Sequence, residues 1–301
     1  MKKILIWGVT YTADLAFQML CKTYNIMGFY DNDMDKQGKI YHNLKVFTLD
    51  ELIRRRKEFE ILIAVPRYKA VIEKQCYDLK LKVMGIFRED RIEMYKPLHF
   101  EDLIGRDRIE LYAGDVPTTE FYKDKVGLSI CQANDRHIYH NILDPYPLPD
   151  NSVDSYVAED VLEHLPYDSL INVINEIHRV LKWGGVFRLA LPDYRNDIMD
   201  MRSLKDEKGD ILFDPNGGGS YKNGKVIKGG HLWFPKYETV KSLIENSLFA
   251  KYEFLHYYNI DGSSITNSID YSIGYIQRTP DHLEKAKRPY RALSIVVDMY
   301  K

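Results

Sequence analysis

Two histidines in this 301-residue chain are suited to proton transfer near neutral pH. His164 follows the apolar stretch VDSYVAE, and His231 lies in GGHLWF, after the glycine-rich run at residues 217–219. Histidine titrates near neutrality, and a positioned base accelerates the reaction of a hydroxyl by about 10²–10⁴-fold. We therefore predict that both are catalytic. Backbone hydrogen bonding at a helix start is the alternative role for His164, and loop packing beside Trp233 is the alternative for His231.

Asp193 is the third candidate catalytic residue. It ends the predicted strand VFRLALP and precedes Tyr194, so it lies at the edge of a sheet where substrates bind. Capping of a turn is the alternative role for this aspartate. Arg195, Arg202 and Lys205 follow and could hold a phosphate, but a solvated charged face explains them more simply.

The run from Asp160 to His164 contains a second pattern, Asp160-x-x-Glu163-His164. On a helix, residues at i, i+3 and i+4 share one face, so two carboxylates and an imidazole could bind a divalent metal. The alternative is that the carboxylates lie at a helix N-terminus, where the helix dipole stabilises negative charge. The second interpretation is favoured, so we predict no bound metal.

An α/β scaffold is expected to position these side chains. Strands are predicted at RIELYA, KVGLSI, VDSYVAE and VFRLALP, with Gly114 turning the first of them. The segment LINVINEIHRVLK predicts an amphipathic helix ended by Gly184 and Gly185. Its expected inward positions are Ile171, Ile174, Ile177, Val180 and Leu181. The final run, SIVVDMY, suits an antiparallel edge strand.

An earlier unit has the same alternation. Strands are predicted at KKILIWGVT, IMGFYDND, EILIAVP and KVMGIF, with helices between them. Such alternation predicts parallel sheets with right-handed crossovers. The predicted fold is therefore α/β with two Rossmann-like, doubly wound sheets. The irregular stretch near Pro97 places the domain boundary between residues 1–97 and 98–301.

Three pieces of the second unit together resemble the class I S-adenosylmethionine methyltransferases (type 11-like). They are PLPDNSVDSYVAEDVLEHL, HRVLKWGGVFRLALPD and GGHLWFPKYETVKSLIENSLF, in the order that the family uses. Trp183 replaces the usual proline. The resemblance covers about residues 108–250 and implies S-adenosylmethionine as the cofactor.

The resemblance also implies which residues contact the cofactor. The glycine-rich motif retains one glycine, Gly114, and the acidic residue that binds the ribose is replaced by Ser129. A serine loses the charge-assisted hydrogen bond, which is about twice as strong as a neutral one. Asn141 takes the place of the aspartate near adenine, where its carbonyl can contact N6. The full predicted set is Gly114, Asp115, Ser129, Asn141, Ile142, Glu159 and Asp160.

The first unit, over residues 1 to about 95, resembles the small nucleotide-sugar-binding domain of some sugar-modifying acyltransferases. Gly8-x-Thr10-x-x-Ala13 has the spacing of a dinucleotide-binding loop but only its first glycine. Asp31 lies where an acidic residue would bind ribose hydroxyls. A structural or docking role for this unit is the alternative.

Composition argues against several classes of protein. The chain has 42 Lys+Arg against 44 Asp+Glu, a net charge of −2, which lacks the basic footprint of nucleic-acid binding. No stretch approaches the roughly 20 apolar residues of a membrane span, and the start does not resemble a signal peptide. Three scattered cysteines fit neither zinc nor a disulfide framework. We expect a cytoplasmic protein without a membrane span that acts on a small-molecule or carbohydrate substrate, with homo-oligomerisation left open.

The predicted function is S-adenosylmethionine-dependent methyl transfer. The acceptor is predicted to be an oxygen of a sugar, nucleotide sugar or surface-polysaccharide precursor. The first alternative is a non-catalytic binding module that recognises a nucleotide sugar or partner protein. A nicotinamide-dependent sugar oxidoreductase is disfavoured, because Tyr68 and Lys69 are adjacent and do not form a Tyr-x-x-x-Lys pair.

Overall fold

The computed structural model describes residues 1–93, 97–277 and 292–301. By its internal contacts the chain divides into two units. Unit 1 comprises Met1–His99 and Ser129–Tyr139, and unit 2 comprises Phe100–Leu128 and His140–Lys301. None of the helices in the described ranges has the length and apolarity needed to cross a membrane.

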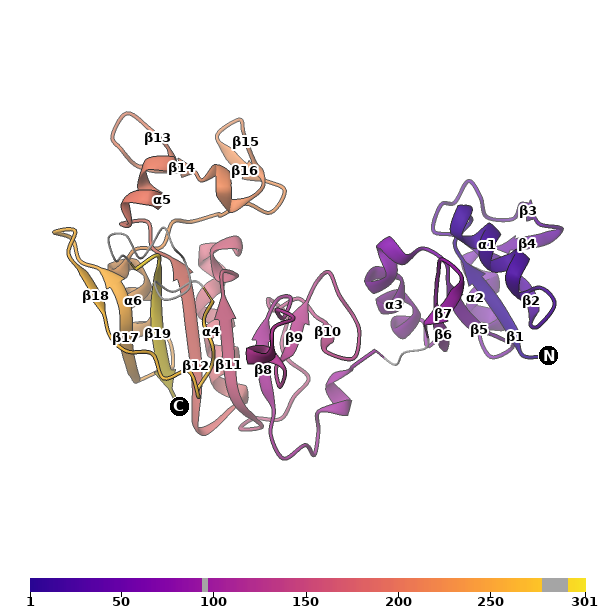
Figure 1. Ribbon diagram of the computed structural model, residues 1–301, viewed down its shortest axis with the longest axis horizontal. Helices are drawn as coiled ribbons and strands as arrows, with labels where there is room; N and C mark the ends of the chain where they lie inside the picture. The colour runs from indigo at the N-terminus through magenta and orange to yellow at the C-terminus, as the bar shows by residue number, and fades with distance from the viewer. Residues whose placement is uncertain (94–96, 278–291) are drawn as a thin grey trace. The chain divides into compact units, whose positions relative to one another are not determined.

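Unit 1 carries a seven-stranded sheet in the order β3-β4-β2-β1-β5-β6-β7 (Figure 1). The strands from β4 to β6 are parallel, as predicted, and β3 and β7 pair antiparallel at the two edges. Its elements are β1 (Lys3–Trp7), α1 (Tyr11–Leu20), β2 (Asn25–Tyr30), β3 (Ile40–Tyr41), β4 (Leu44–Phe47), α2 (Leu49–Arg55), β5 (Glu60–Ile63), a 3-10 turn (Pro66–Tyr68), α3 (Lys69–Asp78), β6 (Val83–Arg88) and β7 (Arg91–Glu93).

Both faces of this sheet are buried, because successive side chains of β1 point to opposite faces. Ile4 and Ile6 pack in one apolar cluster with residues of α1, and Leu5 and Trp7 pack in another with residues of α2 and α3. Thr10 caps α1 by accepting a hydrogen bond from the backbone N–H of Ala13. The doubly wound arrangement predicted for this unit is confirmed.

An eight-stranded sheet has the order β10-β9-β8-β11-β12-β19-β17-β18 (Figure 1). Strands β9, β8, β11 and β12 are parallel, and β19 is antiparallel to both β12 and β17. The elements from residue 100 to β12 are a 3-10 turn (Phe100–Asp102), β8 (Glu110–Ala113), a 3-10 turn (Glu120–Tyr122), β9 (Val126–Ser129), β10 (His137–Tyr139), β11 (Val153–Glu159), 3-10 turns at Leu162–His164 and Tyr167–Ser169, α4 (Leu170–Val180) and β12 (Leu181–Pro192).

A long insertion follows β12 and contains two small hairpins (Figure 1). The remaining elements are α5 (Asp197–Arg202), β13 (Leu204–Lys205), β14 (Ile211–Phe213), a 3-10 turn (Pro215–Gly217), β15 (Ser220–Lys222), β16 (Lys225–Ile227), α6 (Tyr237–Glu245), β17 (Lys251–Tyr258), β18 (Ser264–Thr266) and β19 (Ser294–Tyr300). Helix α4 contacts both β12 and α6.

The α/β class is confirmed, with three local corrections. The antiparallel strand at 294–300 forms, but it lies between β12 and β17, and β18 is the edge strand. Helix α4 ends at Val180, before the glycines, which lie in an irregular stretch of β12 where the register with β11 shifts. The buried positions of α4 begin at Leu170, and Ile171 is exposed, because the 0, 3, 4, 7, 10 spacing starts one residue earlier.

The connection between β8 and β9 is mostly irregular. Residues 114–125 contain a single 3-10 turn where a doubly wound sheet has a helix. Tyr122 from this turn and Ile276 pack instead in the apolar cluster on that face of the sheet, together with Tyr112 and Val157. Irregular segments therefore take the place of a helix over part of this face.

Candidate functional site

Glu163, His164 and His231 come together in unit 2, although 67 residues of sequence separate the last two. Among the described residues they form a cluster in which one potential ligand atom from each side chain lies within 4.8 Å of the others. The two imidazole rings meet edge to face, with centroids 4.7 Å apart. His231 Nε2 lies 3.7 Å from Glu163 Oε1. Glu163 and His231 are buried, and His164 is half-buried.

Three hydrogen bonds join the two segments that carry this cluster. The backbone N–H of Leu232 donates to the Glu163 carbonyl at 2.8 Å, and the Trp233 indole donates to the Leu162 carbonyl at 2.9 Å. His164 Nδ1 lies 2.9 Å from the Gly229 carbonyl. A carbonyl can only accept, so Nδ1 carries the proton and the lone pair of a neutral His164 is on Nε2. The predicted backbone contact of His164 is present, and it also orients the ring.

The tautomer of His231 follows from a chain of buried polar groups. The Tyr194 hydroxyl donates to Asp214 Oδ2 at 2.6 Å, and Arg202 Nε donates to the same oxygen at 3.1 Å. His231 Nδ1 lies 2.5 Å from the Tyr194 hydroxyl oxygen. Because that hydroxyl gives its proton to Asp214, it accepts one from Nδ1. A neutral His231 therefore also has its lone pair on Nε2.

The charges in this chain favour the same arrangement. Burial alone would raise the pKa of Asp214, but hydrogen bonds from Arg202 and Tyr194 outweigh it and hold that pKa below its usual value. Burial, followed by the hydrogen bond to Asp214, raises the pKa of Tyr194. Asp214 is thus a carboxylate, and Tyr194 is a neutral donor.

Sequence reasoning missed Asp214 and misplaced Arg202. Asp214 is fully buried, and Arg202 pairs with it instead of forming a solvated face. The only local signal was a turn pattern, Asp-Pro-Asn-Gly, which explains why Asp214 Oδ1 accepts from the Asn216 backbone N–H. No spacing in the sequence connects this turn to His231.

Asp160 does not share a helix face with Glu163 and His164, so this expectation is wrong. Residues 162–164 form one 3-10 turn, and Asp160 precedes it in a left-handed conformation with φ of 54°. The backbone N–H of Asp160 donates to the Ala190 carbonyl, as a continuation of the β11–β12 pairing. His231 takes the third place in the cluster.

Asp193 is fully buried at the end of β12. One carboxylate oxygen accepts from the backbone N–H of Arg195 at 3.0 Å and the other from that of Tyr258 at 2.9 Å. Burial raises the pKa of Asp193 to about 6, against the lowering by these two hydrogen bonds. The hydrogen bond from Arg195 is the kind that a turn cap makes, which was the alternative role, and the one from Tyr258 joins the end of β12 to the end of β17.

The predicted cofactor residues of unit 2 follow the parallel strands. Gly114 comes directly after β8 with φ of 85°, a left-handed conformation that favours glycine. Asp115 and Asn141 are exposed, and Ile142 is buried. Asn141 Oδ1, the oxygen predicted to reach adenine, accepts from the backbone N–H of Leu143 at 3.1 Å.

Two further cofactor candidates are buried and engaged by the protein itself. The Ser129 hydroxyl ends β9 and accepts from the backbone N–H groups of Cys131 and Gln132, both at 2.9 Å. The Glu159 carboxylate accepts from the Tyr122 hydroxyl at 2.9 Å and from the backbone N–H of Gln277 at 2.7 Å. Ser129 therefore stabilises the turn after β9, and Glu159 links the end of β11 to Tyr122 and Gln277.

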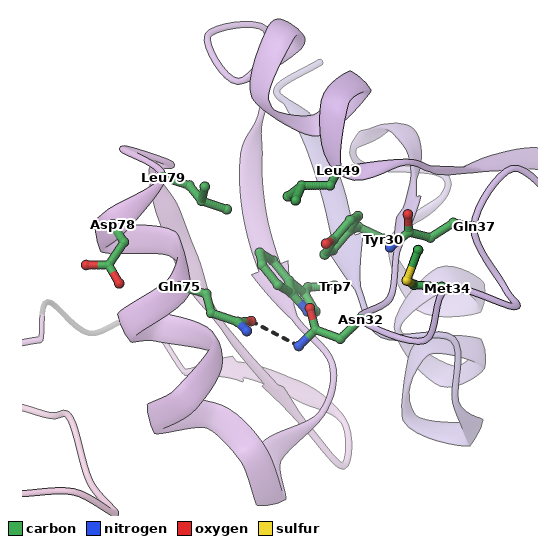
Figure 2. Close-up of a pocket in the computed structure, with 9 residues that line it drawn as sticks. All are labelled: Trp7, Tyr30, Asn32, Met34, Gln37, Leu49, Gln75, Asp78 and Leu79. Carbon is green, nitrogen blue, oxygen red and sulfur yellow. Dashed lines mark hydrogen bonds between the residues drawn. The ribbon is translucent and has the colours of Figure 1, made fainter.

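Unit 1 contains a pocket of about 550 Å³. Trp7 and Tyr30 lie between an apolar side, with Leu49 and Leu79, and a polar side where Asn32 Nδ2 donates to Gln75 Oε1 at 3.0 Å (Figure 2). The two aromatic rings meet edge to face, with centroids 4.6 Å apart. Met34, Gln37 and Asp78 complete the lining. The nine lining residues, all within the described part of unit 1, include no lysine or arginine.

The predicted nucleotide-binding residues of unit 1 lie near the start of α1. Asp31 Oδ2 accepts from the backbone N–H of Val9 at 2.9 Å and from Lys36 Nζ at 3.1 Å, and Oδ1 accepts from the backbone N–H of Asp33. Both oxygens are thus used inside the protein. Gly8 has φ of 125°, and a Cβ there would meet Val65 at 2.5 Å, so this glycine serves chain packing.

Comparison with known proteins matches two family models to the chain. The model described as "Methyltransferase domain" matches residues 118–189, and that described as "C2185-like, N-terminal" matches residues 1–87. The tRNA N(3)-cytidine methyltransferase METTL2 of Bos taurus is 39% identical over 67 residues, which are 22% of this chain and 17% of that protein. The chain thus spans about 17% of the length of this curated relative.

Solved structures similar to the chain include two of different activity. A SAM-dependent methyltransferase from Archaeoglobus fulgidus is 15% identical with a TM-score of 0.38, covering 64% of this chain and 86% of that one. UDP-D-quinovosamine 4-dehydrogenase from Vibrio fischeri is 20% identical with a TM-score of 0.28, covering 35% and 98%.

The segment matched by the methyltransferase model carries the turn with Glu163 and His164, together with β11, α4 and most of β12. It lies within a sheet whose parallel strands are followed by the inserted antiparallel strand β19. This chain therefore contains a methyltransferase domain of the class I type, for which S-adenosylmethionine is the cofactor.

Proposed function

We propose that this protein transfers a methyl group from S-adenosylmethionine to an oxygen of a sugar, nucleotide sugar or surface-polysaccharide precursor. The observation that carries the methyl transfer is the match of residues 118–189 to the methyltransferase domain. Such a transfer is an in-line displacement from a sulfonium, so the protein must hold the acceptor oxygen near the methyl carbon and exclude water. Positioning of this kind supplies about 7–11 kcal/mol of the barrier.

The residues of unit 2 fit the cofactor best at Gly114. A Cβ at this position would touch only Val161 Cγ2, at 3.4 Å, so the turn is open on its other sides. The exposed Asp115 and Asn141 and the half-buried Asp160 provide polar groups for adenosine or for the methionine part. The cofactor supplies the electrophilic methyl group. We assign activation of the acceptor hydroxyl to the cluster of Glu163, His164 and His231.

Asp193 is a positioning residue in this proposal. Its carboxylate is fully buried and accepts from the backbone N–H groups of Arg195 and Tyr258, so it fixes the backbone on both sides of Tyr194. Tyr194 in turn contacts His231. The effect of Asp193 on catalysis would thus pass through the orientation of that histidine.

The pocket of unit 1 supports a sugar-containing ligand. Carbohydrates and nucleosides present apolar faces and hydroxyl edges, which suit the rings of Trp7 and Tyr30 and the amides of Asn32 and Gln75. A lining without lysine or arginine favours the uncharged part of such a ligand over its diphosphate.

The cysteines Cys21, Cys76 and Cys131 are free thiols, which supports the predicted cytoplasmic location.

Calorimetric titration of the full chain with S-adenosylmethionine and S-adenosylhomocysteine tests the cofactor site. Gly114→Ala places a methyl group where the cofactor is proposed to approach the backbone, at a residue with φ of 85°. Loss of about 1.4 kcal/mol of binding free energy is a factor of ten, so we expect binding to weaken by roughly tenfold or more. Gly105→Ala is a matched control in the same unit. Gly105 has φ of 86°, close to the 85° of Gly114, and a Cβ there meets nothing within 4 Å. Alanine at Gly105 therefore introduces a similar positive-φ strain without touching the proposed cofactor contact. Absence of binding in the wild-type protein would favour the binding-module alternative.

The acceptor is tested separately with methyl-labelled S-adenosylmethionine. UDP-, GDP- and dTDP-linked sugars form one arm, and unmodified tRNA forms the other. Label on a sugar that is retained after alkaline treatment, which cleaves methyl esters, supports O-methylation of the sugar ring. Label on tRNA alone would overturn the sugar assignment while leaving methyl transfer intact.

A further inference from the structure

The cluster in unit 2 has the composition and geometry of a metal site. It presents two imidazoles and one carboxylate, and one atom from each lies within 4.8 Å of the other two. Two histidines and one glutamate are a known ligand set for Zn²⁺ that leaves a coordination position open. We propose that Glu163, His164 and His231 bind a divalent transition-metal ion, with Zn²⁺ as the preferred ion.

The separation of His231 Nε2 and Glu163 Oε1 excludes a direct hydrogen bond between them and is also compatible with two ligands of one metal ion. At 3.7 Å these atoms are too far apart for a hydrogen bond, which requires about 2.7–3.2 Å. Two ligands of a tetrahedral Zn²⁺, each about 2.1 Å from the metal, are separated by about 3.4 Å. The observed distance is thus close to that between neighbouring ligands around a metal.

Both imidazoles have the tautomer that metal binding needs. His164 Nδ1 donates to the Gly229 carbonyl, and His231 Nδ1 donates to the Tyr194 hydroxyl. Each neutral ring therefore directs the lone pair of Nε2 away from these partners. Metal-bound histidines usually donate their second N–H to such an acceptor, which fixes the ring and increases its basicity.

The supporting structure holds the ligands before a metal arrives. The Glu163 carbonyl accepts from the backbone N–H of Leu232, next to His231, so the two ligand-bearing segments are joined. On its other side the His231 ring lies against Gly217, where a Cβ would be 2.7 Å from Cγ of the ring. The ring of the half-buried His164 is oriented by its hydrogen bond to the Gly229 carbonyl.

Metal binding by this cluster does not depend on the proposed function. Only the role of the metal in binding the acceptor hydroxyl rests on it. The open coordination position would take the acceptor hydroxyl, and a bound cation lowers the pKa of such an oxygen. The methyl donor takes no part in holding the metal. Metal binding can therefore be measured without S-adenosylmethionine or an acceptor.

The test is titration of the chelator-stripped full chain with Zn²⁺ alone, followed by calorimetry and by metal analysis after gel filtration. The expected result is a single high-affinity Zn²⁺ per chain, with Mg²⁺ not competing. Glu163→Gln and His164→Asn should each lower the affinity by on the order of 100-fold, since outer-shell changes alone cost about 10–100-fold. His178→Asn is the matched control, because this half-buried histidine of α4 lies outside the cluster and packs on Phe249. It should bind Zn²⁺ like the wild type.

Co²⁺ provides a second readout that does not depend on activity. Co²⁺ bound by this cluster should show visible absorption bands that disappear in His164→Asn, whose half-exposed position makes misfolding a poor explanation. Circular dichroism checks that each variant is folded. Weak Zn²⁺ binding by the stripped wild type, or equal affinity in the wild type, Glu163→Gln and His164→Asn, would overturn the proposal.

Discussion

Replacing Gly217 by alanine should displace His231 without removing any polar group. A Cβ at Gly217 would lie 2.7 Å from Cγ, 2.8 Å from Cδ2 and 2.9 Å from Nδ1 of the His231 ring. Gly217 is absent from the residues with positive φ, so alanine is compatible with its backbone. The three nearest atoms to the added Cβ thus all belong to the imidazole.

The size of the displacement follows from these distances. Carbon atoms in contact are normally about 3.5–4.0 Å apart, so the ring must move by about 0.8 Å or more. The ring is buried and hydrogen-bonded to Tyr194, so the movement breaks the alignment of Nδ1 with the hydroxyl. Overpacking of this kind destabilises a protein by about 1–3 kcal/mol. A misplacement of about 1 Å can reduce the rate of a reaction by about 100-fold.

Gly218→Ala is the control for general damage to the loop. Gly218 has φ of 82°, and a Cβ there would meet only the Gly229 carbonyl, at 3.6 Å. With ψ of −178° this residue is in a backbone region that is essentially restricted to glycine, so alanine costs about 1–3 kcal/mol, which is similar to the overpacking at Gly217 but leaves His231 in place.

The assay compares Zn²⁺ affinity by calorimetry with melting temperature for both variants. Gly217→Ala should lose on the order of 10–100-fold in affinity, the range expected when a metal ligand loses its orientation. Gly218→Ala should lose stability but keep its affinity. The reasoning would be refuted if Gly217→Ala bound Zn²⁺ like the wild type, or if both variants lost affinity equally.

Three further outcomes are expected. Tyr194→Phe removes the acceptor of the His231 Nδ1 proton, so Zn²⁺ affinity should fall by about 10–100-fold, while an unchanged affinity would show that this hydroxyl does not orient the ring. Both carboxylate oxygens of Glu73 are buried with no hydrogen-bond partner in the described part of the chain, and burial raises the pKa of Glu73 to about 8. The pKa of Glu73 is about 8 in the folded protein and 4.5 in the unfolded chain, so the folded state binds the proton more tightly. This contribution to stability is complete below pH 4.5 and is lost as the pH rises through 8. The free energy of unfolding should therefore decline between pH 5 and 8, by up to about 1.4 kcal/mol per pH unit, relative to Glu73→Gln, and parallel pH curves in chemical denaturation would contradict this. Asp298→Asn breaks a buried pair in which Arg188 donates at 2.7 and 2.6 Å, so unfolding should become easier by about 3–5 kcal/mol, whereas a loss below 1 kcal/mol would argue against an ionised pair.

Much of the fold could be predicted because it depends on local patterns. The runs at 153–159 and 294–300 form strands with the predicted bounds, since apolar runs of this length bury well in a sheet. The helix start at Leu170 also follows from apolar spacing. Its end was misplaced because Leu181 begins β12 by pairing with Val153, and the sequence around Gly184 does not show that partner.

The candidate site was only partly predictable, for a related reason. Histidine chemistry and loop position were sufficient to single out His164 and His231 as separate candidates. Their union with Glu163 depends on hydrogen bonds between segments that are 67 residues apart, such as that from Leu232 to the Glu163 carbonyl. The assumption of a helix placed Asp160 in the cluster, whereas the chain there turns through a left-handed residue.

The sequence by itself determined the residue types available for chemistry, the alternation of strands and helices, and the segment with methyltransferase character. These properties arise from side-chain chemistry and from periodicity over a few residues. Tertiary structure alone decided that Asp214, Tyr194 and His231 form one chain of buried polar groups, which sets the proton on Nδ1. Buried polar groups must find partners wherever the packing brings them, and that packing is a property of the whole unit.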